Sequence, residues 1–514
     1  MSAAKQRLFL PVLLALWAAF TAWCAWGFPP PVDLPAHGAQ LQTLVNLLRG
    51  DAALRELYEI RVPIGYGLVY WLFLPVAFLW NGAVAVRVAL WVALLLYPIS
   101  QLALLRAFRR PDWLVLLGLP LAFNFSYWYG LLSGLFALPL ALLTIAAFER
   151  AIQSSDASTS LRETPAERGQ VGQGEQDHRT EPPTARDRRD GARREWIWLA
   201  LVNLGAAATL QSHLVAFVAL TLLLAVLALC HPPRVRSLRI AAIGLALPLL
   251  ISVPKIWSMA FRAVTPGPWP PTEFALMSHL NWFFRNYRPE GRLAAWGPVL
   301  VSSAMVLLYL RRRRKEPLAP AAMFIALLLL YLATPKTLSG IFLISVRLPV
   351  LAGMISLLLV DGSAIPKPLR AGLVVISLAS LVETGVFHWR FARAIDGLDA
   401  MIQGPPPGRH GYWSLAGKEI LGSRLIYLEH LGQWLTAARG GVGHNFFADA
   451  EHHPVRFKPG VEIPTDLSQA TPSQLAQFDQ ILIFGEGQLP PWLDGFHEVA
   501  RVKAWRKLLR QQAR

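Results

Sequence analysis

The chain begins with an apolar run, Leu8–Phe28 (LFLPVLLALWAAFTAWCAWGF), which follows two basic residues, Lys5 and Arg7. About 20 residues are enough for a helix to span ~30 Å of hydrocarbon. The run is rich in tryptophan and has no small-x-small cleavage site, so we expect an uncleaved membrane helix rather than a secretory signal peptide. The two basic residues predict that the N-terminus faces the cytoplasm.

Apolar segments of the same kind recur through the first three quarters of the chain. Hydrophobic residues make up 54% of the 514 residues and charged residues only 16%, and the mean hydropathy is +0.40. A soluble globular enzyme needs more charge than this to cover its surface. The further segments lie at 64–80, 83–105, 113–128, 130–148, 196–210, 213–230, 238–256, 293–310, 318–333, 341–360 and 370–388. We therefore expect an all-α polytopic membrane protein with about 11–13 transmembrane helices.

Basic residues are concentrated between these segments. The net charge is +17, from 49 Lys and Arg against 32 Asp and Glu. This pattern is typical of the positive-inside bias of membrane loops, and it gives no reason to expect nucleic acid as a partner. It places loop 149–195 and Arg311–Lys315 in the cytoplasm and loop 29–63 outside. The number of crossings in the N-terminal third conflicts with this, so either 64–80 or 113–128 should not cross the membrane fully.

Two stretches do not have the character of membrane segments. Residues 149–195 are rich in charge, Gly, Pro, Ser and Thr, which predicts a disordered cytoplasmic loop that is either a linker or regulatory. After a transmembrane domain at 1–388, the tail 389–514 is long enough for a small extracytoplasmic α/β domain. Within it, Gln480–Phe484 has the composition of a buried strand, and Val502–Arg514 that of a basic amphipathic helix, which could lie on the membrane.

The first outer loop, 29–63, holds the candidate catalytic residues Asp33 and His37, directly after the Pro run that ends the first helix. If a helix starts at Pro35, Asp33 lies near its N-cap and His37 in its first turn. A carboxylate at the membrane surface can act as a base or bind a divalent cation, here Mg²⁺ or Mn²⁺. The alternative is that Asp33 only caps the helix. The residues that follow, 40–48, have helical apolar spacing and could lie along the membrane surface.

Polar side chains inside apolar segments are costly in lipid, so they are candidates for substrate binding. Arg347 lies six residues into an apolar segment, where it either binds a phosphate or forms a buried ion pair with Asp33 or Glu383. His213 lies at a break between two short apolar segments. Lys255 ends a helix before the next outer loop, although snorkelling alone would explain its position.

The remaining substrate-binding candidates lie in the outer loop 257–291 and in a break at 124–129. Glu273 follows a stiff Pro-rich stretch of the outer loop that could cover a lipid or a sugar. Asn124 and Tyr127 belong to a polar and aromatic break between apolar segments, where ordinary residues of the interfacial aromatic belt are the alternative interpretation.

The tail also contains a cluster of potential metal ligands, but their spacing matches no tight ligand pattern, which favours a solvated loop. They are His444, Asp449, Glu451, His452 and His453. Both cysteines, Cys24 and Cys230, lie in apolar runs, which predicts neither a disulfide framework nor a cysteine metal site. No P-loop precedes a helix, no GxSxG occurs and no GxGxxG follows a strand, so ATP-driven and Rossmann chemistry are unsupported.

Several of these features together resemble the integral-membrane glycosyltransferases of the GT-C superfamily, which use polyprenyl-phosphate-linked sugar donors. They are the early acid Asp33 in a long outer loop, the entry to the second segment at 60–70 (IRVPIGYGLVY), about a dozen helices and an outward C-terminal domain. The stretches 123–143 (FNFSYWYGLLSGLFALPLALL) and 211–220 (QSHLVAFVAL) are similar to those of uncharacterised bacterial membrane proteins of this type.

The resemblance implies a bacterial inner-membrane protein of the cell envelope that binds a lipid-linked sugar donor. It would make Asp33 the catalytic or metal-binding carboxylate and Arg347 the residue that holds the donor phosphate. Members often have a second acid in a later outer loop. Here the region around Asn124 has none, and Asp112 is expected in the cytoplasm.

Two functions of different classes follow. In the first, Arg347, with Lys255 or His213, neutralises the phosphate of the donor, and Asp33 deprotonates the hydroxyl of an extracytoplasmic acceptor. In the second, the same cavity belongs to a non-catalytic transporter, flippase or binding subunit for a lipid-linked intermediate. A structural membrane subunit whose outer domain docks a partner is a third interpretation.

Overall fold

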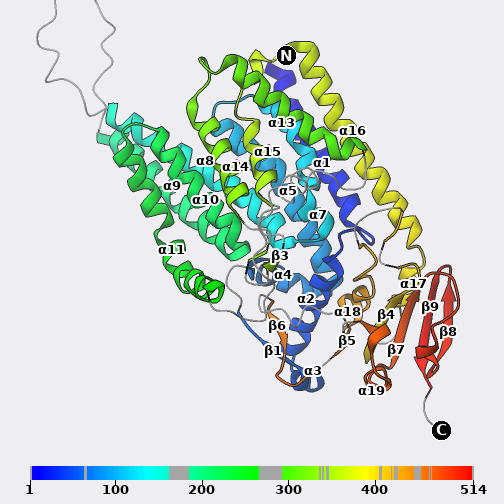
Figure 1. The fold of residues 1–514 in the computed structure, drawn as a ribbon. Coiled ribbons are helices and arrows are strands. Elements are labelled where there is room, and N and C mark those ends of the chain that lie inside the picture. The colour runs from blue at the N-terminus through cyan, green and yellow to red at the C-terminus, as the bar shows by residue number, and fades with distance from the viewer. Residues whose placement is uncertain are drawn as a thin grey trace, which may run out of the picture.

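The computed structural model describes residues 3–62, 66–160, 185–264, 292–334, 337–338, 341–342, 347–403, 408–417, 419–421, 426–444, 453–461, 463–464 and 466–511. Helices form a long bundle, and a small sheet built from the C-terminal part of the chain lies at one end of it (Figure 1). The expected helical membrane fold with a small α/β part at the C-terminus is therefore confirmed.

Apolar helices make up the bundle. Among the described residues, five helices are long and apolar enough to span a membrane: α1 (Ala3–Ala25), α5 (Gly82–Ala107), α8 (Leu132–Ser160), α11 (Arg234–Val264) and α16 (Lys367–Ala394). Shorter or partly polar helices complete it: α4 (Leu68–Leu79), α9 (Ala185–Ser212), α10 (Leu214–Cys230), α13 (Arg292–Arg312), α14 (Leu318–Ala333) and α15 (Leu348–Ser356). Large apolar side chains such as Leu16, Leu250 and Val382 are exposed, and lipid must cover them. The chain is a multi-pass membrane protein.

The expected segment 113–128 is a series of short helical pieces rather than one helix. They are η1 (Asp112–Leu114), α6 (Val115–Gly118), η2 (Leu119–Phe123) and α7 (Phe125–Tyr129). Pro120 at the start of η2 cannot donate a helical hydrogen bond, and the Asn124 side chain caps α7. Together the pieces rise about 30 Å, enough to cross the hydrocarbon core.

The short segment that does not cross is α4. Its 12 residues rise only about 18 Å. Near its C-terminus, the carbonyl of Phe78 accepts a hydrogen bond from Arg49, which follows α2 (Leu34–Leu48). Near its N-terminus, the hydroxyl of Tyr70 contacts His37 in the first turn of α2. Both ends of α4 therefore contact α2 at the same end of the bundle, which removes the conflict in the number of crossings.

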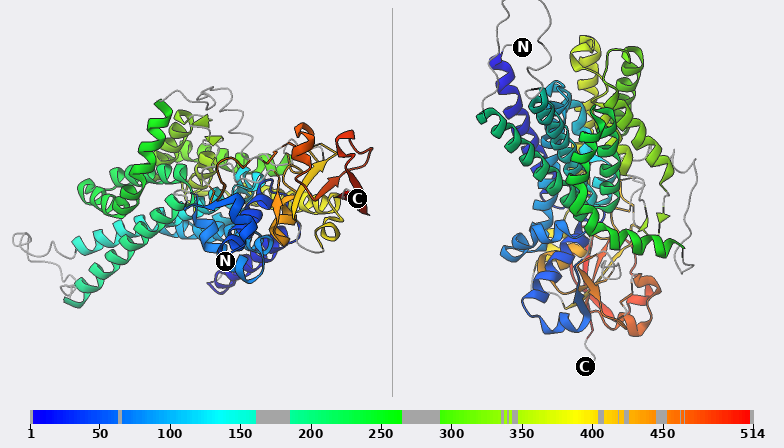
Figure 2. Two further views of the ribbon diagram at one scale, coloured as in Figure 1. Left: turned by 90° about the horizontal axis from the view of Figure 1, so that it is seen from below. Right: turned by 90° about the vertical axis from the view of Figure 1, so that its left-hand side faces the viewer.

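The two ends of the bundle differ in chemistry. At one end, Arg106 pairs with Asp112 at 2.7 Å and Arg110 pairs with Glu316 at 3.0 Å. At the other end lie α2 and the C-terminal sheet (Figure 2). We call these the Arg106 end and the Asp33 end.

The flanks of the expected disordered loop 149–195 are helical, which corrects that prediction. Helix α8 continues to Ser160 and α9 begins at Ala185, and the two helices pack against each other. Gln153 also donates to the carbonyl of Ala107 at 2.8 Å, so the extension of α8 has a partner on α5. The central residues, 161–184, lie outside the described part of the chain.

The C-terminal sheet has the strand order β5-β4-β7-β9-β8. Its strands are β4 (Arg409–Ser414), β5 (Val442–Gly443), β7 (Gln480–Phe484), β8 (Phe496–Val502) and β9 (Trp505–Arg510). Strand β4 runs parallel to β5 and β7, whereas β9 runs antiparallel to β7 and β8. Every residue of β7 is buried, as its composition predicts. Helix α16 runs to Ala394, past the expected domain boundary at 388.

Small elements complete the C-terminal part and the loops that precede α15 and α16. They are α17 (Leu398–Ile402), α18 (Gln433–Arg439), α19 (Pro472–Leu475), η4 (Gly362–Ala364), η6 (Leu467–Gln469), η7 (Pro491–Leu493) and the antiparallel pair β2 (Thr337–Leu338) and β3 (Ile341–Phe342). The basic stretch from Val502 is not a helix: it ends β8 and forms β9. An isolated short helix is marginal in water, whereas β9 gains a hydrogen-bonded partner on each side and buries Trp505.

Helix α2 is enclosed between the bundle and the C-terminal part, which corrects the expectation that 40–48 lies on the membrane surface. Residues 34–45 are all buried, and α5 and α18 pack against the helix. After α3 (Ala52–Leu57), β1 (Tyr58–Ile60) pairs antiparallel with β6 (Val455–Phe457). The first loop and the tail therefore form one packed unit.

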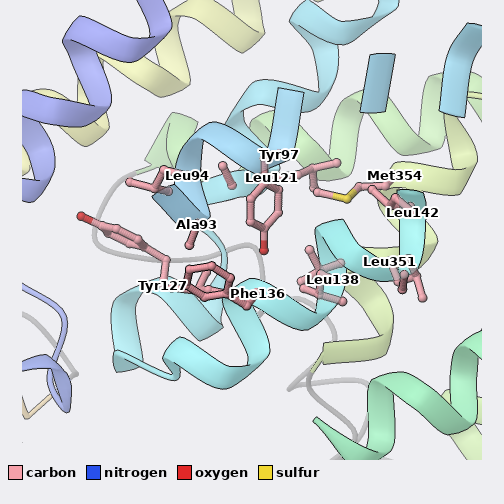
Figure 3. Packing of buried hydrophobic residues seen from close by; sticks show 14 of the residues in the cluster. Ala93, Leu94, Tyr97, Leu121, Tyr127, Phe136, Leu138, Leu142, Leu351 and Met354 are labelled. Carbon is pink, nitrogen blue, oxygen red and sulfur yellow. The ribbon is translucent and has the colours of Figure 1, made fainter. Parts of the chain in front are cut away.

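Beneath this unit, the core of the bundle is apolar and closely packed. Tyr97 of α5, Leu121 of η2, Phe136 of α8 and Met354 of α15 meet there (Figure 3). The core thus fixes the turn between α7 and α8, which borders the candidate site.

Candidate functional site

Asp33 immediately precedes α2, and only 8% of it is exposed. The sequence predicts its place at the N-cap, but its side chain makes no capping hydrogen bond. Helix capping therefore does not explain this carboxyl. Instead, its Oδ1 atom lies 3.5 Å from Nε2 of His430.

Burial raises the pKa of Asp33 well above its ordinary value, and the negative charge of Glu429 raises it further. Glu429 and His430 lie just before α18, in the C-terminal part. A second acid near Asp33 therefore comes from the tail and not from a later outer loop, where the resemblance led us to expect it. The available signal was a Glu-His pair inside the apolar run 426–431 (IYLEHL).

The turn after α7 holds the backbone of Asp33. The N–H groups of Val32 and Asp33 donate to the carbonyls of Trp128 and Tyr129, at 3.1 and 3.0 Å. Gly130 follows with φ +79°, and a Cβ atom there would lie 2.7 Å from the backbone nitrogen of Asp33. Only glycine combines this conformation with so close an approach of two backbones.

His37 belongs to a chain of three polar groups. Its Nδ1 lies 2.6 Å from the hydroxyl of Tyr70, which lies 2.7 Å from Nδ1 of His453. A phenol donates only one hydrogen bond, so one imidazole accepts from it and the other donates to it. The carboxyl of Asp33 is close enough to act on Tyr70 electrostatically. These hydrogen bonds thus join α2, α4 and the tail around Asp33.

Arg347 belongs to a second cluster, beside the first turn of α8. It precedes α15, is 5% exposed, and has its Nε 2.9 Å from the point where a Cβ on Gly134 would lie. The hydroxyl of Tyr66 interacts electrostatically with Arg347, and its ring lies 4.9 Å from the ring of His213. His213 is fully buried and caps α10, at the break that the sequence predicts.

The two clusters border one stretch of chain. Gly130 contacts the backbone of Asp33 and Gly134 contacts Arg347. Four peptide units separate these glycines, so their Cα atoms are at most about 15 Å apart. Asp33 pairs with His430, and among the described residues no ion pair joins Arg347 to Asp33 or Glu383. A buried carboxyl and a buried guanidinium thus border the same short stretch of chain, and neither is the ion-pair partner of the other.

The other sequence candidates have different surroundings. Asn124 accepts from the N–H of Ser126 at 2.8 Å and donates to the carbonyl of Leu121 at 2.8 Å, so its amide is used in capping and turn formation. The hydroxyl of Tyr127 bonds to His388 on α16. The side chain of Lys255 and the whole of Glu273 lie outside the described part of the chain.

Within the described part of the chain, no three His, Cys, Asp or Glu side chains gather as metal ligands. Asp33 with His430 offers fewer groups than Mg²⁺ or Mn²⁺ needs. In the tail, His444 accepts from the N–H of Tyr412 at 3.0 Å, and His453 contacts Tyr70. Asp449, Glu451 and His452 lie outside the described residues. The described residues therefore complete no cation site.

No protein-family model and no curated protein matches this chain. Two crystal structures of ArnT from Cupriavidus metallidurans are similar to it as a whole. The structure in the apo state is 13% identical, with a TM-score of 0.45, and the match covers 99% of this chain and 98% of that one. The structure bound to undecaprenyl phosphate is 12% identical, also with a TM-score of 0.45, and 98% of each chain is covered. At this level of similarity, the function of the chain has to be inferred from its own residues.

Proposed function

We propose that the chain is a membrane glycosyltransferase that transfers a sugar from a polyprenyl-phosphate donor to a hydroxyl of an extracytoplasmic acceptor. The observation that carries the proposal is the pair of buried groups around the turn 126–134. Asp33, whose carboxyl caps no helix, contacts Gly130 through its backbone, and the guanidinium of Arg347 lies against Gly134. Glycosyl transfer from a phosphate needs a base for the acceptor and a cation for the leaving phosphate.

On the donor side, Arg347 binds the phosphate. A guanidinium presents several N–H groups in a planar fork that matches phosphate oxygens. Ser126 and Tyr66 lie beside it and can donate further hydrogen bonds to the same anion. As the bond between the anomeric carbon and the phosphate oxygen breaks, negative charge grows on this oxygen, and Arg347 stabilises it.

On the acceptor side, Asp33 takes the proton of the acceptor hydroxyl. The oxygen then forms a bond to the anomeric carbon, and the polyprenyl phosphate leaves with the electrons of the broken bond. A carboxylate whose pKa is raised is a stronger base than an ordinary one, because it holds the proton more tightly. His430 and Glu429 come from the tail, so the C-terminal part completes the surroundings of this base.

The second candidate function is a carrier or binding subunit for a lipid-linked intermediate. The buried Arg347 at the start of α15 supports it, because a carrier also needs a cation for the phosphate. The isosteric variant Asp33→Asn discriminates between the two. An enzyme loses sugar transfer in this variant, whereas a carrier is indifferent to it and sensitive to Arg347→Gln.

The test uses the full chain in membranes with polyprenyl-phosphate sugars as donors. We expect Asp33→Asn to lower transfer at least 100-fold while donor binding persists. Asp361→Asn is the matched control, since Asp361 caps η4 and its N–H donates to Glu316 at the Arg106 end of the bundle. Full transfer by the Asp33→Asn variant would refute the enzymatic proposal, and unchanged donor binding by Arg347→Gln would refute both functions.

A further inference from the structure

An open cleft of about 910 Å³ lies between α2–α3 and the C-terminal sheet. Its volume is in the range of small-molecule sites. The cleft is lined by the second half of α2 from Gln42 onward, whereas Asp33 precedes the first residue of the helix. Gln42 follows Asp33 by nine residues, which corresponds to about 14 Å along the helix. The cleft is therefore a feature distinct from the Asp33 site.

Three arginines from three elements line the cleft. They are Arg49 after α2, Arg409 at the start of β4 and Arg439 at the end of α18. Within the described part of the chain, each guanidinium donates one hydrogen bond, to a backbone carbonyl or to an amide oxygen. A guanidinium has five N–H groups, so each retains donors for a ligand.

Three acids also line the cleft, but two of them serve the backbone. Asp51 accepts from the N–H of Leu54 at 3.1 Å, and Asp479 accepts from the N–H of Arg409 at 2.7 Å. The third, Glu56, is exposed to solvent. Asp51 and Asp479 thus hold the surrounding loops in shape, whereas the remaining donors of each guanidinium are available to a ligand.

The type of lining favours an anion over a neutral sugar. Among the described residues that line the cleft, none is aromatic, so the apolar face of a neutral sugar finds no ring to stack on. Arginines on separate elements can instead surround the oxygens of one phosphate. Gln42, Asn46 and Gln477 add further hydrogen-bonding groups to the lining.

We propose that this cleft binds a phosphate-bearing head group, and that in the full reaction it holds the acceptor by this group. The first statement stands without any enzymatic activity, whereas the second rests on the proposed function. The cleft begins about 14 Å along α2 from Asp33, a distance that an extended acceptor anchored by its phosphate can span.

The binding test uses the full chain purified in detergent, with glucose 1-phosphate as the soluble probe and glucose as its neutral counterpart. Vesicles of phosphatidylcholine with and without phosphatidic acid present the same phosphate on a lipid. We expect saturable binding of a phosphate probe that weakens as salt is added. The double variant Arg409→Gln/Arg439→Gln should weaken it at least tenfold, and Arg49→Gln provides a separate test that leaves the sheet untouched.

The matched control is Arg501→Gln on β8, where the arginine pairs with Glu498 outside the cleft. Binding of either phosphate probe that is lost in the cleft variants and kept in this control supports the proposal and identifies the source of the phosphate. Equal affinity for glucose, or full binding by all cleft variants, overturns it. The Asp33→Asn variant should bind the probe normally. If that variant also transfers sugar normally, the enzymatic proposal fails while the cleft proposal stands.

Discussion

The substitution Gly130→Ala tests whether the turn after α7 positions Asp33. Gly130 has φ +79°, a conformation that costs an L-residue about 1–2 kcal/mol. The new Cβ would also lie 2.7 Å from the backbone nitrogen of Asp33, and ordinary contact begins at 3.4 Å. The two backbones must therefore separate by roughly 0.7 Å, because packed interiors do not tolerate such overlap. We expect a loss of about 2–3 kcal/mol in stability.

The functional consequence is larger than the loss of stability. A displacement of about 1 Å in a reacting group can cost 100-fold in rate. We therefore expect about 100-fold slower sugar transfer by folded Gly130→Ala protein, measured in membranes at saturating donor. Gly372→Ala is the control, because a Cβ on this helical glycine meets nothing within 4 Å and should be neutral or stabilising. In an Asp33→Asn background, Gly130→Ala should slow the residual transfer no further. Wild-type transfer by Gly130→Ala would refute the argument that this turn positions the carboxyl.

Three further predictions concern pH and topology. Since burial raises the pKa of Asp33, and the ionised form acts as the base, the transfer rate should rise with pH well above the ordinary carboxyl range; a midpoint near pH 4 would contradict this. Burial lowers the pKa of His410 and His444 to about 3. The unfolded tail therefore binds protons that the folded tail does not, and the free energy of unfolding should fall as the pH is lowered from 6.5 to about 3. The free energy of unfolding should change by at most about 1.4 kcal/mol per pH unit for each histidine. Hydrogen exchange of β4 measures this pH dependence, and the His444→Gln variant should show half of it. Because α4 does not cross the membrane, the exposed residues Val62 and Trp80, which flank it in the sequence, should lie on the same side. Single cysteines at these positions should then react with a membrane-impermeant reagent added to that side. Labelling from opposite sides would show that α4 spans the membrane.

The membrane class and most helices could be predicted from the sequence because apolar runs of sufficient length have few alternatives in lipid. The strand at 480–484 was equally predictable, since it is short, apolar and enclosed by polar residues. The stretch from Val502 to Arg510 was not. Its charges suit a surface helix, and it forms a strand because it pairs with β7 on one side and β8 on the other. The helical ends of loop 149–195 were also missed, because nothing local in the sequence shows that α8 and α9 pack against each other and extend into the loop.

The candidate site was partly predictable. Asp33, His37, His213 and Arg347 stand out because polar groups near lipid are costly. Their partners Tyr66 and Tyr70 lie in a stretch that was noticed for its resemblance, yet nothing in it reveals which side chains the tyrosines meet. Glu429 and His430 are almost 400 residues from Asp33, and no local pattern connects groups at that separation.

The tail is part of the candidate site rather than an appendage to it. Asp33 and its neighbours would be open to water if the bundle stood alone, because His430 and α18 cover the first half of α2. An exposed carboxyl at this position would have an ordinary pKa and would be a weaker base, since desolvation is the largest cause of the shift. The same packing forms the wall of the arginine-lined cleft, as Arg409 and Arg439 come from the tail and Arg49 from the first loop. Both proposed sites therefore depend on one interface, so a change that loosens the contact of α18 with α2 should impair phosphate binding and sugar transfer together, whereas changes inside either site should separate them.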